Sequence, residues 1–333
     1  MPRIKTNAIT IEYETFGSAK NEAILLIAGA GAQLTQWPVE LCKKLAKRGY
    51  RVIRFDNRDA GYSSKVSPEK ILSYADALAA LTEGKSDFVS YTLSDMASDA
   101  VGLLDALKIE KAHIAGAAMG GMIAQTIAVE HPARVLSLTS IMSTTGNPDL
   151  PPANEDVQRL LLATAPMASD IERIVARDLE LSRLIGSPDY KTDEAVLREW
   201  ALRDALRSYY PIGTLRQMAA VIASGDRREA LATIKAPTVV LHGGADIYVP
   251  VAAGEDTAKV IPDAQLRVIA GMGHDLPVAL AGQIVEAIVA AAERATGPKV
   301  ADQPGSSSRD SGSEQSGFFA NLFRRFRREP VPV

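Results

Sequence analysis

The chain has 333 residues, 47% of them apolar, and a net charge of −3, values typical of a globular protein with one large domain plus an insertion, or with two domains. This weak charge gives no reason to expect a nucleic-acid partner. The single cysteine, Cys42, excludes an internal disulfide and a multi-cysteine metal site, and it is predicted to be packed on an apolar helix face. The N-terminus lacks the apolar core of a signal peptide and no run approaches 18 apolar residues, so we expect a cytoplasmic protein.

The first half of the chain alternates short apolar segments with helical patterns. Residues 9–16 alternate apolar and polar side chains, which predicts a half-exposed antiparallel strand. Residues 23–28 and 51–55 predict buried strands on either side of a helix over residues 38–48. Thr92 followed three residues later by an acid predicts an N-cap, opening a helix to about residue 107.

The second half continues this alternation around one interruption. Strands are predicted at 111–115, 135–142, 238–242 and 266–270, and helices at 119–130 and 278–293. The order predicts an α/β fold with a mostly parallel sheet flanked by helices. Residues 148–227 begin with three prolines and continue as helical segments without strands, which predicts a helical cap folded over the active edge of the sheet. Residues 1–147 and 228–296 then form the core.

The C-terminal residues change in composition. Residues 297–317 are rich in Ser, Gly and charge, which predicts a disordered linker. In residues 318–333, phenylalanines and a leucine share one helical face opposite four arginines. Such a basic amphipathic tail is suited to an anionic membrane surface or to a groove on a partner protein. Docking back onto the domain and an inert extension are the alternatives.

The segment Gly116-Ala117-Ala118-Met119-Gly120-Gly121 has the backbone pattern of a serine-hydrolase nucleophile elbow but contains no serine. A strand that turns into a helix within three residues forces the central residue into strained geometry, and the flanking glycines allow close packing. The exposed side chain would be the methyl group of Ala118. A small-residue turn without chemistry is the alternative interpretation.

The general base can be sought by elimination, because the chain has only four histidines. His113 lies inside a predicted strand, His131 ends a helix before a proline, and His242 lies at a strand end. His274 remains, in a glycine-rich loop after the last strand. Asp246, just beyond the penultimate strand, is placed to accept its Nδ1 proton, and Asp149 is a possible substitute acid.

Residues 28–32, Ala-Gly-Ala-Gly-Ala, directly follow a buried strand. Their small side chains would let the backbone reach a substrate carbonyl, so the N–H groups of Ala30 and Met119 are candidates for an oxyanion hole. Dinucleotide sites also begin with a glycine-rich loop after a strand, but the G-x-G-x-x-G spacing is absent.

Together these stretches resemble the serine α/β-hydrolase superfamily, in the branch of aclacinomycin methylesterase-like carboxylesterases. The similar segments are residues 28–38, 55–61, 92–121, 242–250 and 271–274. The resemblance implies an α/β-hydrolase fold, a small-molecule ester as substrate, and no metal or organic cofactor. It also implies that residues 56–61 form a turn bracing the oxyanion loop. Ala28 stands where many relatives carry histidine, and Ala118 stands where the family carries its nucleophilic serine.

Three explanations of Ala118 are open: replacement of a native serine to trap substrate, a natural pseudo-hydrolase that binds a ligand or partner, or an active variant in which His274 activates water. Without the nucleophile, a triad site keeps about 10³–10⁴-fold acceleration over water. We therefore expect the chain to bind esters and to turn them over very slowly. Lyase or oxygen chemistry without a cofactor, on the same scaffold, is a further alternative.

Substrate choice is expected to lie in the cap, whose bulky apolar and aromatic residues either line a pocket or form the cap core. The candidates for the pocket are Leu161, Met167, Trp200, Tyr209 and Tyr210.

Overall fold

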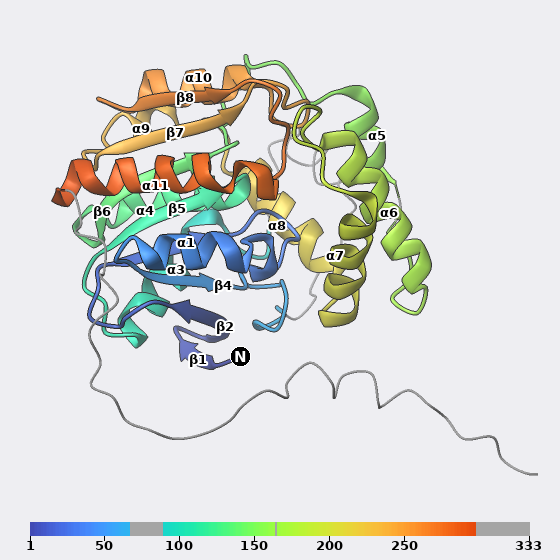
Figure 1. Cartoon of the computed structure of the whole chain (residues 1–333), viewed down its shortest axis with the longest axis horizontal. Coiled ribbons are helices and arrows are strands. Elements are labelled where there is room, and N and C mark those ends of the chain that lie inside the picture. Colours follow the sequence, from blue (N-terminus) through green and yellow to red (C-terminus); the bar gives the residue numbers. More distant parts are fainter. Residues whose placement is uncertain (67–88, 164, 298–333) are drawn as a thin grey trace, which may run out of the picture. The chain divides into compact units, whose positions relative to one another are not determined.

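The computed structural model describes residues 1–66, 89–163 and 165–297, which form an α/β fold around one eight-stranded sheet (Figure 1). The strand order is β1-β2-β4-β3-β5-β6-β7-β8. The first two strands, β1 (Arg3–Thr6) and β2 (Ile9–Phe16), form an antiparallel hairpin, and β2 also pairs antiparallel with β4. Every later neighbouring pair is parallel, which confirms the predicted fold class.

The parallel strands are β3 (Ala23–Ile27), β4 (Arg51–Phe55), β5 (Ala112–Ala117), β6 (Val135–Ile141), β7 (Thr238–Gly243) and β8 (Gln265–Ile269). The helices that flank the sheet are α1 (Val39–Lys47), α3 (Leu93–Ala106), α4 (Met119–Glu130), α10 (Val251–Val260) and α11 (Ala281–Thr296). Apart from α10, for which no helix was predicted, these elements match the predicted segments to within a few residues. The hairpin strand β1 was not predicted from the sequence.

Helices cover both faces of the sheet because the central strands are apolar on both sides. In β3, Leu25 and Ile27 belong to an apolar cluster with side chains of α3 and α4, whereas Ile24 and Leu26 belong to a second cluster with α1 and α11. Alternate residues of a strand point to opposite faces, so an unbroken apolar run requires cover on both. The two clusters fix the sheet between its helix layers.

The start of α3 confirms the predicted N-cap. The Thr92 hydroxyl accepts a hydrogen bond from the Asp95 N–H at 3.2 Å, and the Asp95 carboxylate accepts one from the Thr92 N–H at 2.8 Å. This reciprocal pair satisfies two of the amide groups that a helix start leaves without partners.

The insertion between β6 and β7 consists of helices α5 (Glu155–Leu162), α6 (Ile171–Ile185), α7 (Glu194–Arg207), α8 (Pro211–Ala223) and α9 (Arg228–Leu231). Apart from residue 164, the whole insertion is described and contains no strand. Helices α6 and α7 pack through a small apolar core of their own. All described residues fall in one compact unit, which includes both the insertion and the core.

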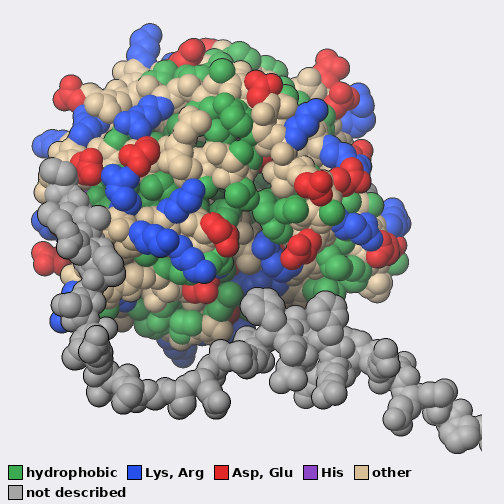
Figure 2. All heavy atoms as spheres, in the orientation of Figure 1, with side chains coloured by type: hydrophobic (Ala, Val, Ile, Leu, Met, Phe, Trp, Pro, Cys, Tyr) green, Lys and Arg blue, Asp and Glu red, His purple; other side chains and the backbone are tan. Residues whose placement is uncertain are grey.

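Figure 2 shows acidic and basic side chains interspersed over one face of the molecule, with apolar side chains between them. Among the described residues, no helix is long and apolar enough to cross a membrane. The predicted linker and tail, residues 297–317 and 318–333, lie outside the described residues except for Gly297.

Candidate active site

Ala118 has the backbone geometry of a nucleophile elbow. It joins β5 to α4 with φ 52° and ψ −120°, in the region that side-chain-bearing residues rarely adopt. Its N–H donates to the Ile141 carbonyl at 2.9 Å, and its carbonyl accepts from the Gly121 N–H and the Ser143 hydroxyl, each at 2.9 Å. These bonds hold the strained conformation, and the methyl group remains partly exposed.

The close approach of strand and helix around Ala118 requires glycine. A Cβ atom at Gly116 would lie 1.9 Å from the Gly120 carbonyl oxygen, and one at Gly120 would lie 2.2 Å from the Ile27 carbonyl oxygen. Both contacts are with backbone atoms, which cannot rotate away. The glycines predicted to permit the turn are therefore sterically necessary there.

His274 and Asp246 form a buried hydrogen-bonded pair. The His274 Nδ1 lies 2.7 Å from the Asp246 Oδ2, and the other carboxylate oxygen accepts from the N–H groups of Tyr248 and Val249 at 2.9 and 2.8 Å. Because a carboxylate can only accept hydrogen bonds, Nδ1 donates in this pair, which in a neutral imidazole leaves the lone pair on Nε2. The Tyr248 ring packs on the imidazole with 4.7 Å between centroids.

The alternative acid and the neighbouring histidine are placed differently. Asp149 is exposed, and its N–H donates to the Asn147 side chain at 2.9 Å. His242 is fully buried, its Nε2 lies 2.8 Å from the Val249 carbonyl oxygen, and burial lowers its imidazole pKa. A neutral His242 therefore donates to that carbonyl, and the Asp246 carboxylate pairs with His274.

The elbow, the acid and the histidine lie at one edge of the sheet. The residue that follows each of β5, β6 and β7 donates a backbone hydrogen bond to the end of the next strand: Ala118 N–H to Ile141 O at 2.9 Å, Met142 N–H to Leu241 O at 2.8 Å, and Gly244 N–H to Ile269 O at 2.9 Å. A fourth bond, from the Ala245 N–H to Met272 O at 2.9 Å, joins the loop after β7 to the loop after β8. Because the strands are parallel, these loops share the carboxyl edge, where ligands bind in open α/β sheets.

The loop after β3 presents a free amide beside the elbow. The Gly29 N–H donates to the Gln36 side chain at 2.8 Å, and the Gly31 N–H donates to the Gln217 side chain at 2.7 Å. Between them, the Ala30 N–H has no acceptor within the part of the chain described, and the same holds for the Met119 N–H at the start of α4. Both predicted oxyanion-hole amides therefore lack an acceptor among the described residues.

Residues 56–61 brace this loop, as the resemblance implied. The Asp56 carboxylate accepts from the Leu34 N–H at 2.7 Å, and the Asn57 side chain donates to the Ala28 carbonyl at 3.0 Å. Arg207 of α7 pairs with the same Asp56 carboxylate at 2.7 Å. Arg207, Gln36 and Gln217 were not anticipated from the sequence, since two of them lie in the insertion, far along the chain from the loop they hold.

A cavity of about 1510 Å³ lies between the insertion and these loops. Ala30 and His274 line it, together with four of the predicted pocket residues: Leu161, Trp200, Tyr209 and Tyr210. Ala118 and Met119 are not part of its lining. Met167 was predicted wrongly, because it lies between α5 and α6 with its side chain 72% exposed and away from the cavity wall.

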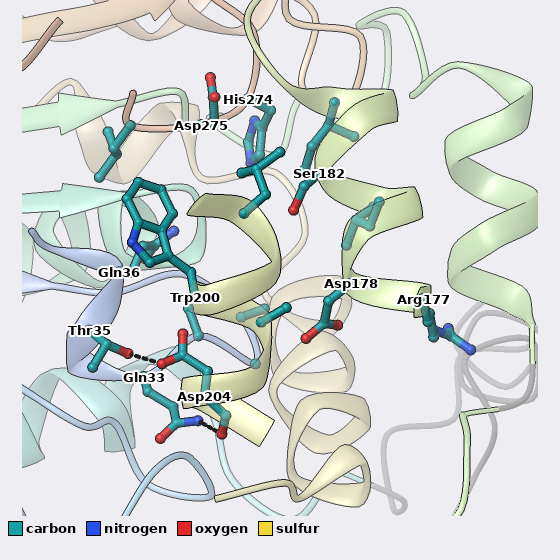
Figure 3. Close-up of a pocket in the computed structure, with 18 of the residues that line it drawn as sticks. Gln33, Thr35, Gln36, Arg177, Asp178, Ser182, Trp200, Asp204, His274 and Asp275 are labelled. Carbon is teal, nitrogen blue, oxygen red and sulfur yellow. Dashed lines mark hydrogen bonds between the residues drawn. The ribbon is translucent and has the colours of Figure 1, made fainter. Parts of the chain in front are cut away.

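Figure 3 shows polar side chains from α6 and α7 on the wall of this cavity. Burial, and secondarily Asp204, raises the pKa of Asp178 to about 6. The Asp204 carboxylate accepts from the Thr35 hydroxyl at 2.9 Å, which ties α7 to the loop after β3. Within residues 1–66, 89–163 and 165–297, no three His, Cys, Asp or Glu side chains gather as a set of metal ligands.

A family model described as alpha/beta hydrolase fold matches residues 22–278. The chain belongs to this family. Rhodomycin D methylesterase DauP from Streptomyces sp. (strain C5) is 28% identical over 311 residues, covering 88% of this chain and 98% of that protein. Putative carbamate hydrolase RutD from Variovorax paradoxus is 28% identical over 267 residues, covering 79% and 89%.

Among solved structures, an enol-lactonase from Burkholderia xenovorans LB400 superposes with a TM-score of 0.67 at 22% identity, covering 87% of this chain and 99% of that one. A serine-to-alanine mutant of the meta-cleavage product hydrolase CumD from Pseudomonas fluorescens IP01 gives a TM-score of 0.70 at 19% identity, covering 89% and 98%. These likenesses show the shared fold. The methylesterase and the carbamate hydrolase are both named as hydrolases.

Proposed function

We propose that this scaffold is that of a carboxylic ester hydrolase with Ser-His-Asp chemistry, and that residue 118 is its nucleophile position. With alanine there, the chain binds esters and turns them over very slowly. The observation that carries the proposal is the His274 to Asp246 hydrogen bond of 2.7 Å, at the same sheet edge as the strained elbow. The methylesterase name of one relative supports an ester as substrate.

With serine at position 118, the hydroxyl attacks the ester carbonyl while the His274 Nε2 takes its proton. The carboxylate of Asp246 stabilises the imidazolium that forms. The N–H groups of Ala30 and Met119 hold the oxyanion of the tetrahedral intermediate. His274 then protonates the leaving alcohol, and water repeats the cycle on the acyl-enzyme to release the acid.

The alanine at position 118 removes the covalent step and leaves the rest of this arrangement. A triad site without its nucleophile retains about 10³–10⁴-fold acceleration over water, from binding and the oxyanion hole. Turnover by the chain as it stands is therefore expected to be measurable only at high enzyme concentration.

A ligand-binding protein built on the hydrolase fold is the second candidate. The observation that favours it is the alanine itself, in a protein whose large cavity has polar and aromatic walls and is lined by Ala30 and His274. Such a protein would bind an ester or a related ligand without any catalytic need for His274.

The Ala118→Ser variant, assayed with short p-nitrophenyl esters, separates the two candidates. We expect a burst of p-nitrophenol followed by turnover at least about 100-fold above the unsubstituted chain. The matched control is Ala32→Ser, which adds a hydroxyl to the cavity wall at a position that is not the strand-to-helix turn and should give no burst. If Ala118→Ser folds, binds the ester and shows no gain, the binding-protein candidate replaces the hydrolase.

A further inference from the structure

We infer that Ser187, in the loop after cap helix α6, is a positioning residue that fixes the orientation of His274. This inference rests on the proposed function, because it assigns the cap a part in holding the general base. Ser187 itself is not expected to touch the reacting atoms.

Residues 185–189 are joined to the histidine loop by backbone hydrogen bonds at His274 itself and at Gly271, three residues before it. The His274 N–H donates to the Ile185 carbonyl at 2.7 Å, and the Asp189 N–H donates to the Gly271 carbonyl at 3.3 Å. These contacts join two segments that lie far apart in the sequence. They tie the end of α6 to the loop that carries the imidazole.

The Ser187 hydroxyl occupies the centre of this junction. It accepts a hydrogen bond from the Gly273 N–H at 2.9 Å and donates one to the Asp275 carboxylate. The residues immediately before and after His274 are thus held by the same oxygen atom. Ser187 is only 3% exposed, so water cannot readily replace its two bonds.

Two further observations show that this junction has little freedom. A Cβ atom at Gly273 would lie 2.4 Å from the Ile185 carbonyl oxygen, so the two loops meet backbone to backbone. Burial raises the pKa of Asp275, while hydrogen bonds from Ser187 oppose that rise. Without the hydroxyl, a largely buried carboxylate next to His274 would lose one of its donors, and the Gly273 N–H would lose its acceptor.

The same helix also forms part of the cavity wall, through Asp178 and Ser182 (Figure 3). A ligand packed against α6 therefore contacts the element whose end holds His274. The expected signature of Ser187 is a change in kcat rather than in KM, because the residue acts on the base and not on ligand contacts.

The kinetic test adds Ser187→Ala to the Ala118→Ser variant. We expect kcat to fall by about 10- to 100-fold with KM changed less than about twofold. Ser137→Ala is the matched control: this serine is 1% exposed and its hydroxyl lies 2.9 Å from the His113 Nδ1, away from the carboxyl edge. It should lower stability but leave kcat within about twofold. Replacing Asp275 with asparagine in the Ser187→Ala variant should recover part of kcat, because a neutral amide is less destabilised than a carboxylate by the loss of the hydroxyl.

A second measurement needs no turnover and uses the unsubstituted chain. The Nδ1 proton held between His274 and Asp246 should give a downfield proton resonance, assigned by its loss in His274→Ala. Ser187→Ala should shift or broaden this resonance, and Ser137→Ala should not. If Ala118→Ser proves inactive, the hydrolase proposal fails while the resonance still decides the role of Ser187. An unchanged resonance or an unchanged kcat in Ser187→Ala overturns the inference.

Discussion

Gln217 of α8 is hydrogen bonded to the loop that carries Ala30, a proposed oxyanion-hole residue, and its truncation to alanine tests whether this contact matters for catalysis. Its side chain is fully buried, accepts from the Gly31 N–H at 2.7 Å and donates to the Arg58 carbonyl at 2.7 Å. Leaving a buried polar group without a partner costs about 1–3 kcal/mol. Gly31 is exposed, so water can replace one partner. We therefore expect the free energy of unfolding to fall by only about 1–2 kcal/mol.

The effect of Gln217→Ala on catalysis should be larger than this loss of stability implies. Gln217 holds the residue next to Ala30, whose N–H we assign to the oxyanion hole. Complete loss of one such donor costs about 2.7–4 kcal/mol of transition-state stabilisation. Loosening the loop should remove part of that, so in the Ala118→Ser background we expect kcat to fall by about 10- to 100-fold, or about 1.4–2.7 kcal/mol.

Urea unfolding of the unsubstituted chain and ester kinetics in the Ala118→Ser background measure the two effects separately. The control is Gln158→Ala, an exposed glutamine of α5 that donates to the Ala153 carbonyl at 2.6 Å. It should change stability by less than about 0.5 kcal/mol and leave kcat unaltered. A Gln217→Ala variant that loses stability at unchanged kcat would refute the link between α8 and the oxyanion loop.

Two further predictions concern the elbow and the cavity wall. Gly120→Ala places a Cβ atom 2.2 Å from the Ile27 carbonyl oxygen, so the free energy of unfolding in urea should fall by more than about 3 kcal/mol. Gly282→Ala in α11 meets no atom within 4 Å, so the free energy of unfolding should rise by up to about 1 kcal/mol. Equal effects of the two changes would contradict the steric argument. The pKa of Asp178 is raised from 3.8 to about 6, so ionisation of this carboxyl destabilises the folded state above pH 6 and not below pH 4. Asp178→Asn should therefore raise the free energy of unfolding by about 1–3 kcal/mol at pH 7.5, and this gain should disappear at pH 4. A gain that does not depend on pH would show that Asp178 is not the titrating group.

The order of elements and the candidate site residues could be predicted from local sequence because each depends on a short pattern. Glycines around Ala118 marked the strand-to-helix turn, and chain order selected His274 and Asp246 from few alternatives. The pair then proved to be hydrogen bonded at 2.7 Å. Strand β1 was missed because Arg3–Thr6 is short and mostly exposed, so its pairing with β2 leaves little apolar pattern.

The contacts that hold the site in place could not be predicted in this way. Gln217 lies 186 residues from Gly31, and Ser187 lies 86 residues from Gly273, so no local pattern relates either pair. The position of Met167 could not be predicted for another reason: an apolar side chain in the inserted helices can face either the cavity or the solvent. Only the packing of α5 against α6 decides between them.

Covalent labelling of position 118 tests the central claim most directly. The Ala118→Ser variant should react with one equivalent of a fluorophosphonate, detected by intact mass and mapped to the peptide that contains residue 118. The unsubstituted chain and the Ala118→Ser variant carrying His274→Ala should stay unlabelled over the same time. Absence of the adduct in a folded Ala118→Ser protein, or labelling that is equally fast without His274, would contradict the assignment of this edge of the sheet as a serine-hydrolase site.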